Sequence, residues 1–168
     1  MRAKFIYEYL DLKSKMNENL EIDANRHLFD TGYKIFFDIY VDGKQIGKCE
    51  AITTFKTDDF NETVYDYRLS KNIDFSFGNS VKKDDFDKYY FIIEILNFEI
   101  DESYRGKKYG YKSMELIITY IKEKFPKNKG IYLTVFEANI PAVKIYKKLG
   151  FKIVQEKKWS EKGFIMKL

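Results

Sequence analysis

Alternating apolar and polar residues predict strands in the first third of the chain. Residues 3–12, 34–41 and 45–55 are rich in the β-branched and aromatic residues that strands favour. The pair Asp42-Gly43 separates the second run from the third. Because such a pair favours a two-residue turn, these two runs predict an antiparallel hairpin.

The strongest signals lie between residues 89 and 136. Residues 89–101 are largely apolar on both faces, which predicts a buried central strand. Beyond residue 110 the spacing becomes helical, and the predicted helix runs to about Lys124, just before Pro126. Its apolar stripe consists of Met114, Ile117, Ile118 and Ile121. Residues 131–136 predict another buried strand.

The C-terminal part predicts one helix and one hairpin. Asn139 suits the N-cap of a helix that continues to about Leu149, and Gly150 suits a left-handed stop. Residues 151–158 and 164–168 then predict two strands of a hairpin.

Two segments give weak signals. Residues 13–32 are polar and mixed, and we expect a short helix there. Residues 57–88 alternate between acidic and aromatic residues, with a possible helix near 58–69 and a turn at Gly78-Asn79. A connection this long is often functional, for example as a substrate-binding lid.

The order of elements predicts a mixed sheet with helices packed on its faces, an α/β fold of mixed α+β type. The chain has 168 residues, so we expect one domain spanning 1–168. Its aromatic share of 18% argues for a packed core and against disorder. The net charge of +4 suits a phosphorylated ligand and is too small by itself to indicate nucleic acid.

Several classes of protein are not indicated. A single cysteine, Cys49, excludes a disulfide framework within one chain and fits a reducing compartment. Glu8 and Asp11 interrupt any signal-peptide core, and no apolar run approaches the ~20 residues of a membrane helix. Potential metal ligands do not cluster, and the single histidine, His27, lies outside both motifs described below. We therefore expect a cytoplasmic protein without a metal.

A glycine- and lysine-bearing segment joins the central strand to the helix that follows. It comprises Arg105, Gly106, Lys107, Lys108, Tyr109 and Gly110. The first N–H groups of a helix lack internal partners and favour anions, glycines allow close approach, and lysines add positive charge. The segment therefore predicts a pyrophosphate site, with an ordinary strand-to-helix turn on a lysine-rich surface as the alternative.

Two motifs resemble the GNAT superfamily of N-acetyltransferases. Residues 105–110 resemble its acetyl-CoA loop, Arg/Gln-x-x-Gly-x-Gly/Ala, except that Lys108 stands where the first glycine is usual. Residues 139–151 resemble its segment N-x-x-A-x-x-x-Y-x-K-x-G-F. The resemblance covers about residues 33–168 and implies a mostly antiparallel sheet flanked by helices, with a C-terminal hairpin. The usual helical pair after the first strand is hard to find in 13–32, so 57–88 is a candidate acceptor wall.

The resemblance also implies a reaction and a cosubstrate, namely transfer of an acetyl group from acetyl-CoA to a primary amine by direct attack in a ternary complex. It implies main-chain contacts to the coenzyme along Phe98, Glu99 and Ile100, a pyrophosphate held by 105–110, and further contacts from Asn139 and Tyr146.

Tyr146 and Glu94 are the candidate catalytic residues. Tyr146 follows Asn139 by two helical turns, on the face that the resemblance places beside the coenzyme sulfur, so its phenol is the candidate acid. Glu94 lies on a strand face that we expect it to share with Phe98 and Ile100. A buried carboxylate there suits a general base, and histone acetyltransferases of the superfamily carry their base at the matching distance from the loop.

Simpler roles for these residues remain open. Tyr146 could be a packed core tyrosine, and Glu94 could be a carboxylate that pairs with a lysine or lies at a sheet bulge, with water as the base. Thr134 stands where N-terminal-peptide acetylases carry their glutamate, so that mechanism is not supported. Cys49 as an acyl-carrying nucleophile is less favoured than inert packing.

The acceptor and the oligomeric state stay open. The acceptor could be a polyamine or aminosugar, a protein amine, or an aminoacyl-tRNA, and the acidic residues within 57–88 favour a cationic one. An acyl-CoA-binding regulatory or partner-binding module without turnover is the alternative, and nucleic-acid binding is a weaker third.

Overall fold

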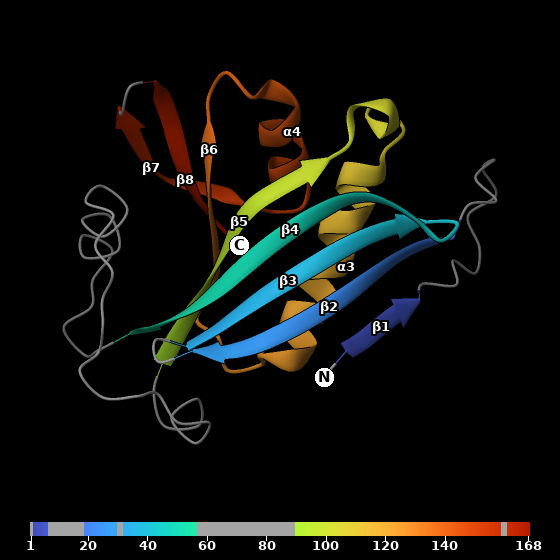
Figure 1. Cartoon of the computed structure of the whole chain (residues 1–168). Coiled ribbons are helices and arrows are strands. Elements are labelled where there is room, and N and C mark those ends of the chain that lie inside the picture. The colour runs from blue at the N-terminus through green and yellow to red at the C-terminus, as the bar shows by residue number, and fades with distance from the viewer. Residues whose placement is uncertain (1, 7–18, 30–31, 57–89, 159–160) are drawn as a thin grey trace.

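One sheet of eight strands organises the computed structural model (Figure 1). The structure describes residues 2–6, 19–29, 32–56, 90–158 and 161–168. In chain order the elements are β1 (Arg2–Ile6), β2 (Leu20–Phe29), β3 (Gly32–Val41), β4 (Lys44–Lys56), β5 (Tyr90–Ile100), a 3-10 turn (Glu102–Tyr104), α3 (Tyr109–Lys124), β6 (Ile131–Phe136), α4 (Ile140–Lys148), β7 (Lys152–Lys158) and β8 (Lys162–Lys167).

The sheet is mixed and mostly antiparallel, as expected. Its strand order is β1-β2-β3-β4-β5-β6-β8-β7, and only the β5–β6 pair is parallel. The parallel step requires a crossover, which α3 supplies. The predicted hairpins are confirmed, and Asp42 and Gly43 both take positive φ angles (49° and 77°) in the β3–β4 turn.

Both described helices contribute to one core on the same face of the sheet. α3 lies behind β2 to β4 in Figure 1, and α4 lies near the start of α3. The ring of Tyr120 on α3 meets Phe37 edge-on at 5.4 Å, and both side chains are fully buried. On α4, Tyr146 meets Phe151 in the same way at 5.8 Å. No helix among the described residues covers the other face.

The expectation for residues 13–32 was wrong where the structure describes them. Residues 20–29 form β2, which pairs with β3 along its whole length. Ile22 and Ala24 are fully buried against the core, whereas Asp23 between them and Glu21 and Asn25 beside them alternate with these residues. That alternation of single polar residues made the strand look like a mixed segment.

Part of the sequence interpretation lies outside the described residues. The strand predicted over 3–12 is present up to Ile6, and the structure does not describe 7–12. The helix near 58–69, the turn at Gly78-Asn79 and the acceptor wall predicted within 57–88 also lie outside the described part.

Candidate active site where β5 and β6 separate

The two central strands pair over a short distance only. β5 and β6 are in register at three positions, where 93–95 face 131–133, although β5 continues to Ile100 and β6 to Phe136. Figure 1 shows the two strands diverging toward α4 and the start of α3. Beyond Ile95, this edge of β5 has no pairing strand within the described part of the chain.

A β-bulge at Asn97 lies where the strands separate. Asn97 has a φ of 48°, and the pairing of β4 with β5 shifts between Lys48↔Glu99 and Glu50↔Leu96. An extra residue in one strand changes the side that later residues face. The bulge therefore reverses the alternation for the last three residues of β5.

This bulge corrects one expectation about Glu94. A Cβ built on Gly110 of α3 would come within 3.9 Å of both Phe98 and Ile100, so these two side chains face the helices. Glu94 precedes the bulge, and its register partners are Ile52 and Tyr132, outside the main core cluster. Glu94 thus lies on the opposite face from Phe98 and Ile100, not on the same face.

The bulge also turns the main chain of β5. The N–H of Asp101 donates to the carbonyl of Ile46 on the β4 side at 2.8 Å. Because main-chain groups alternate along a strand, those of Phe98 and Ile100 face the separated β6 side. Glu99 points its main chain at β4, and its side chain forms an exposed ion pair with Lys48 at 3.8 Å. The edge predicted for the coenzyme is thus offered by Phe98 and Ile100.

The predicted anion loop has an open helix N-terminus. α3 begins at Tyr109, and the N-cap residue Lys108 makes no side-chain capping hydrogen bond. In contrast, the Oδ1 atom of Asn139 caps α4 by accepting from the N–H of Ala142 at 3.3 Å. The side chain at the N-cap of α3 therefore does not cover the start of the helix, which remains suited to an anionic ligand.

The loop glycines have different functions. Gly106 has a φ of 78°, and a side chain built there would meet nothing within 4 Å, so its backbone is open to a ligand. Gly110 instead permits close packing of α3 on α4, because an added Cβ would lie 3.2 Å from Ile145. Lys107 and Lys108 are exposed, and the ammonium of Lys107 lies 5.4 Å from the ring centre of Tyr104.

Tyr146 is buried beneath the separated strands. Its side chain is 7% exposed. Burial, and secondly the electrostatic effect of Cys49, raise the pKa of the Tyr146 phenol. The Sγ atom of Cys49 lies 3.6 Å from the carbonyl oxygen of Leu96, the residue before the bulge. Tyr146, Cys49 and the bulge therefore belong to one neighbourhood, and the phenol stays protonated at neutral pH.

Glu94 is 4% exposed and lies one residue before the last β5–β6 pair. The carboxylate and the phenol thus lie on opposite sides of the sheet at the point where β5 and β6 part. An acceptor could approach from one side while the leaving group departs toward the other.

The other residues considered from the sequence lie where the structure gives no sign of a catalytic role. His27 is exposed and meets the ring of Phe36 at 5.7 Å. Cys49 is buried, and burial, followed by the charge of Glu50, raises the pKa of its thiol, which fits inert packing. Thr134 is exposed on β6. Within the described ranges no three His, Cys, Asp or Glu residues gather as a metal site, and no helix is long and apolar enough to cross a membrane.

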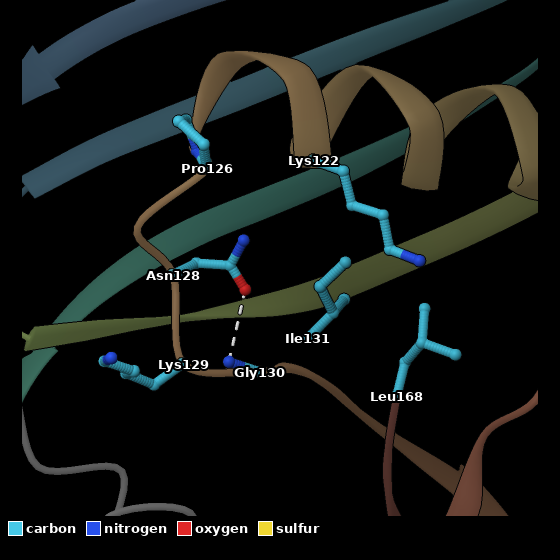
Figure 2. A pocket seen from close by; sticks show the side chains of 7 residues that line it. All are labelled: Lys122, Pro126, Asn128, Lys129, Gly130, Ile131 and Leu168. Atoms are coloured by element: carbon cyan, nitrogen blue, oxygen red, sulfur yellow. Dashed lines mark hydrogen bonds between the residues drawn. The ribbon is translucent and has the colours of Figure 1, made fainter.

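A surface hollow of about 570 Å³ lies at the other end of α3 (Figure 2). Figure 2 shows the side chains of Lys122, Ile131 and Leu168 pointing into the same space, and Asn128 fixes the turn by accepting from the N–H of Gly130 at 3.1 Å. Neither the uncapped helix N-terminus nor the free edge of β5 borders it. The hollow is therefore separate from the candidate active site.

The sequence interpretation missed two features of the site. One is the position of the bulge, which lies at Asn97 and not at Glu94, and for which the only signal was a polar residue within an apolar strand. The other is the Nε–H of Arg105, which donates to the carbonyl of Ile100 at 2.9 Å, an interaction without a sequence signal.

The chain is similar to known proteins in sequence and in fold. The model of the acetyltransferase (GNAT) family matches residues 4–151. The crystal structure of Arabidopsis thaliana NAA60 with acetyl-CoA has the same fold, with a TM-score of 0.53 and 18% identity over 80% of this chain and 75% of that chain. Escherichia coli ElaA has a TM-score of 0.51, with 16% identity over 82% of this chain and 69% of that one.

A curated relative gives a local match of higher identity. The spermine/spermidine N(1)-acetyltransferase of Bacillus subtilis strain 168 is 44% identical over 54 residues, which are 32% of this chain and 35% of the relative. The match thus spans about a third of that protein. Because the family model matches most of the chain, this protein belongs to the GNAT family of acetyltransferases.

Proposed function

We propose that this protein transfers an acetyl group from acetyl-CoA to a primary amine by direct attack in a ternary complex. The observation that carries the proposal is the alignment of three features at one place. The uncapped start of α3, the unpaired edge of β5 after Asn97, and the buried phenol of Tyr146 lie along the opening between β5 and β6. Membership of the GNAT family supports the same activity.

The described residues fit coenzyme A part by part. The N–H groups of residues 106–110 suit its diphosphate. The main-chain groups of Phe98 and Ile100 suit the amides of its pantetheine arm, as in the addition of a strand to a sheet edge. Asn139 is the least direct candidate, because its side-chain oxygen already caps α4. When bound, acetyl-CoA supplies the acetyl group as a thioester.

Glu94 and Tyr146 would divide the proton transfers. Glu94 takes a proton from the acceptor amine, directly or through water, as the C–N bond forms. Tyr146 donates a hydrogen bond to the sulfur as the C–S bond breaks. Because burial raises the pKa of Tyr146, full transfer of its proton to a thiolate with an ordinary pKa of ~8.5 is uphill. Tyr146 would therefore act mainly by stabilising the leaving sulfur.

A polyamine is the first acceptor class to test. The relative that is 44% identical over 54 residues is a spermine/spermidine acetyltransferase. The acidic residues within 57–88 would also favour a cationic acceptor. We further propose that residues 1–168 act as one domain in the cytoplasm, which suits the buried free thiol of Cys49.

An acetylation screen tests the proposal directly. Purified protein is incubated with acetyl-CoA and spermidine, spermine, aminosugars, peptides or charged tRNA, and products are detected by mass. We expect a product in which one acetyl group replaces one hydrogen of the amine, with polyamines reacting fastest. Binding of coenzyme A without product from any amine would instead indicate a module without turnover.

The pH dependence of the rate tests Glu94. A general base works only when deprotonated, so the rate should rise with pH through the pKa of the base. Glu94→Gln should remove this limb and lower kcat by roughly 10²-fold. Glu123→Gln, an exposed carboxylate near the end of α3, is the matched control. An unchanged profile in Glu94→Gln would assign proton removal to water.

A further inference from the structure

The side chain of Arg105 folds back onto the strand that precedes it. Its Nε–H donates to the carbonyl of Ile100 at 2.9 Å. Its main-chain N–H donates to the carbonyl of Glu102 at 3.1 Å, and the N–H of Tyr104 donates to that of Asp101 at 2.9 Å. Residues 100–105 therefore form a compact corner between β5 and the loop.

This contact fixes one peptide group from both sides. The peptide between Ile100 and Asp101 presents its N–H to the carbonyl of Ile46 on β4 at 2.8 Å. Its carbonyl, on the opposite side, is held by Arg105. A peptide held at both ends cannot rotate without losing a hydrogen bond, so the end of β5 keeps one orientation.

The fixed peptide lies between the two parts of the proposed coenzyme site. On one side are the main-chain groups of Phe98 and Ile100, and on the other are the amides of the loop. A rigid junction holds these two sets of groups at a constant separation, which lowers the ordering cost of binding a ligand that contacts both. It also occupies the Ile100 carbonyl, so the arm of the ligand would donate to the carbonyl of Phe98.

We propose that Arg105 is a positioning residue for the pantetheine arm of the coenzyme, acting through the Ile100 carbonyl and not through its charge on the diphosphate. This inference rests on the proposed function. It separates two roles that the same side chain could have. One role needs an N–H donor at the ε position, and the other needs a positive charge.

Two substitutions distinguish these roles. Arg105→Gln keeps an N–H donor at the same distance along the side chain but removes the charge, whereas Arg105→Met removes both. We expect titration calorimetry to show that the Met variant binds coenzyme A about fivefold more weakly than the Gln variant, the effect of one ordinary hydrogen bond. Lys122→Met, at the far end of α3, removes an exposed cation as the control.

A truncated substrate gives a second measurement. S-acetylpantetheine lacks the diphosphate, so kcat/KM with it reports only on the arm. With this substrate we expect kcat/KM of the Met variant to be about fivefold lower than that of the Gln variant, mainly because its KM is higher. Equal affinities of the Gln and Met variants for coenzyme A, or equal kcat/KM values of the two variants with S-acetylpantetheine, would overturn the inference.

The wild-type protein separates this inference from the proposed function. No binding of coenzyme A by the wild-type chain would reject the coenzyme site itself. If the wild type binds coenzyme A and the Gln and Met variants bind it with equal affinity, only the positioning role would be rejected. A thermal melt of each variant checks that the fold is kept, since lost folding would lower the active fraction and kcat instead of raising KM.

Discussion

Lys108 holds a backbone conformation that its side chain disfavours. Its φ of 68° lies in the left-handed region, directly before the first residue of α3. The GNAT family usually has glycine at this position. The conformation explains this preference, since a Cβ there costs roughly 1–2 kcal/mol. The departure from the signature thus places a lysine in a conformation that glycine adopts without strain.

Replacing Lys108 by glycine should therefore stabilise the protein. We expect Lys108→Gly to raise the free energy of unfolding by about 1 kcal/mol, because relief of the left-handed strain exceeds the added chain entropy. Urea unfolding measures this difference. Lys112→Gly, within the first turns of α3, is the opposite control and should cost about 1 kcal/mol. A loss of stability in Lys108→Gly would show that the lysine side chain makes a compensating contact.

Tyr146 either acts in catalysis through its hydroxyl group or only packs in the core through its ring, and removal of the hydroxyl group distinguishes these roles. Removing only the hydroxyl leaves the ring to pack on Phe151. We expect Tyr146→Phe to lower kcat by roughly 10²-fold with little change in the KM for acetyl-CoA. Tyr120→Phe, a buried tyrosine of α3 outside the site, is the control. Unchanged turnover in Tyr146→Phe would leave the residue as core packing.

At the scale of elements, the bulge in β5 determines what the strand presents. It directs Phe98 and Ile100 to the helices and their main-chain groups to the opening, while Glu94 stays on the other face. Asn97 suits this position because asparagine tolerates the left-handed region better than most residues.

Substitutions at Asn97 test the bulge. Asn97→Val introduces a β-branched side chain at positive φ and should lower the free energy of unfolding by roughly 1–3 kcal/mol. It should also weaken coenzyme A binding, because a repaired alternation would turn the strand edge away from the opening. Asn97→Gly accepts the same φ and should retain more of both properties. Urea unfolding and titration calorimetry measure the two effects, and a Val variant matching Gly would contradict this account.

Elements with strong local signals were predictable from the sequence. Periodicity predicted β5, α3 and β6, and the N-cap Asn139 with Gly150 predicted the limits of α4. The turn pair Asp42-Gly43 predicted the β3–β4 hairpin. These signals are contained in neighbouring residues, so no tertiary information is needed to recognise them.

The features that were missed depend on contacts between distant residues. β2 was missed because its single buried residues, such as Ile22 and Ala24, can be recognised as core residues only once β3 and α3 are placed beside them. The position of the bulge at Asn97 was missed because register is set by both strands together. The Arg105–Ile100 hydrogen bond depends on a side-chain direction that no residue pattern encodes. The loop could be recognised from the sequence, but the way its parts are held could not.

At the scale of the whole molecule, three buried acids of the described part, Cys49, Tyr120 and Tyr146, couple stability to high pH, and Cys49 and Tyr146 adjoin the site. Burial raises the pKa of the Cys49 thiol and of the Tyr146 phenol in the folded state. In the unfolded chain these groups lose their protons near their ordinary pKa values of ~8.5 and ~10. Above these values the unfolded chain binds fewer protons than the folded chain. Stability is therefore complete at neutral pH and falls as pH rises.

The difference between wild type and Cys49→Ala isolates the thiol. Replacing the thiol by a hydrogen atom removes the titration, so the stability advantage of wild type should shrink by about 1.4 kcal/mol per pH unit above pH ~9. Urea unfolding of both proteins at several pH values from 7 to 10.5 measures it under reducing conditions. Below pH 8 the difference in stability should be constant, since the thiol is then protonated in both the folded and the unfolded protein.

Tyr146→Phe provides the matched comparison for the phenol. Its difference from wild type should stay constant to about pH 9.5 and shrink only above the ordinary tyrosine pKa of ~10. Two onsets separated by more than one pH unit would assign the two losses to the two residues. A Cys49→Ala difference that stays flat to pH 10.5 would mean that the thiol reaches solvent in the folded protein. The opening between β5 and β6 would then extend below the bulge.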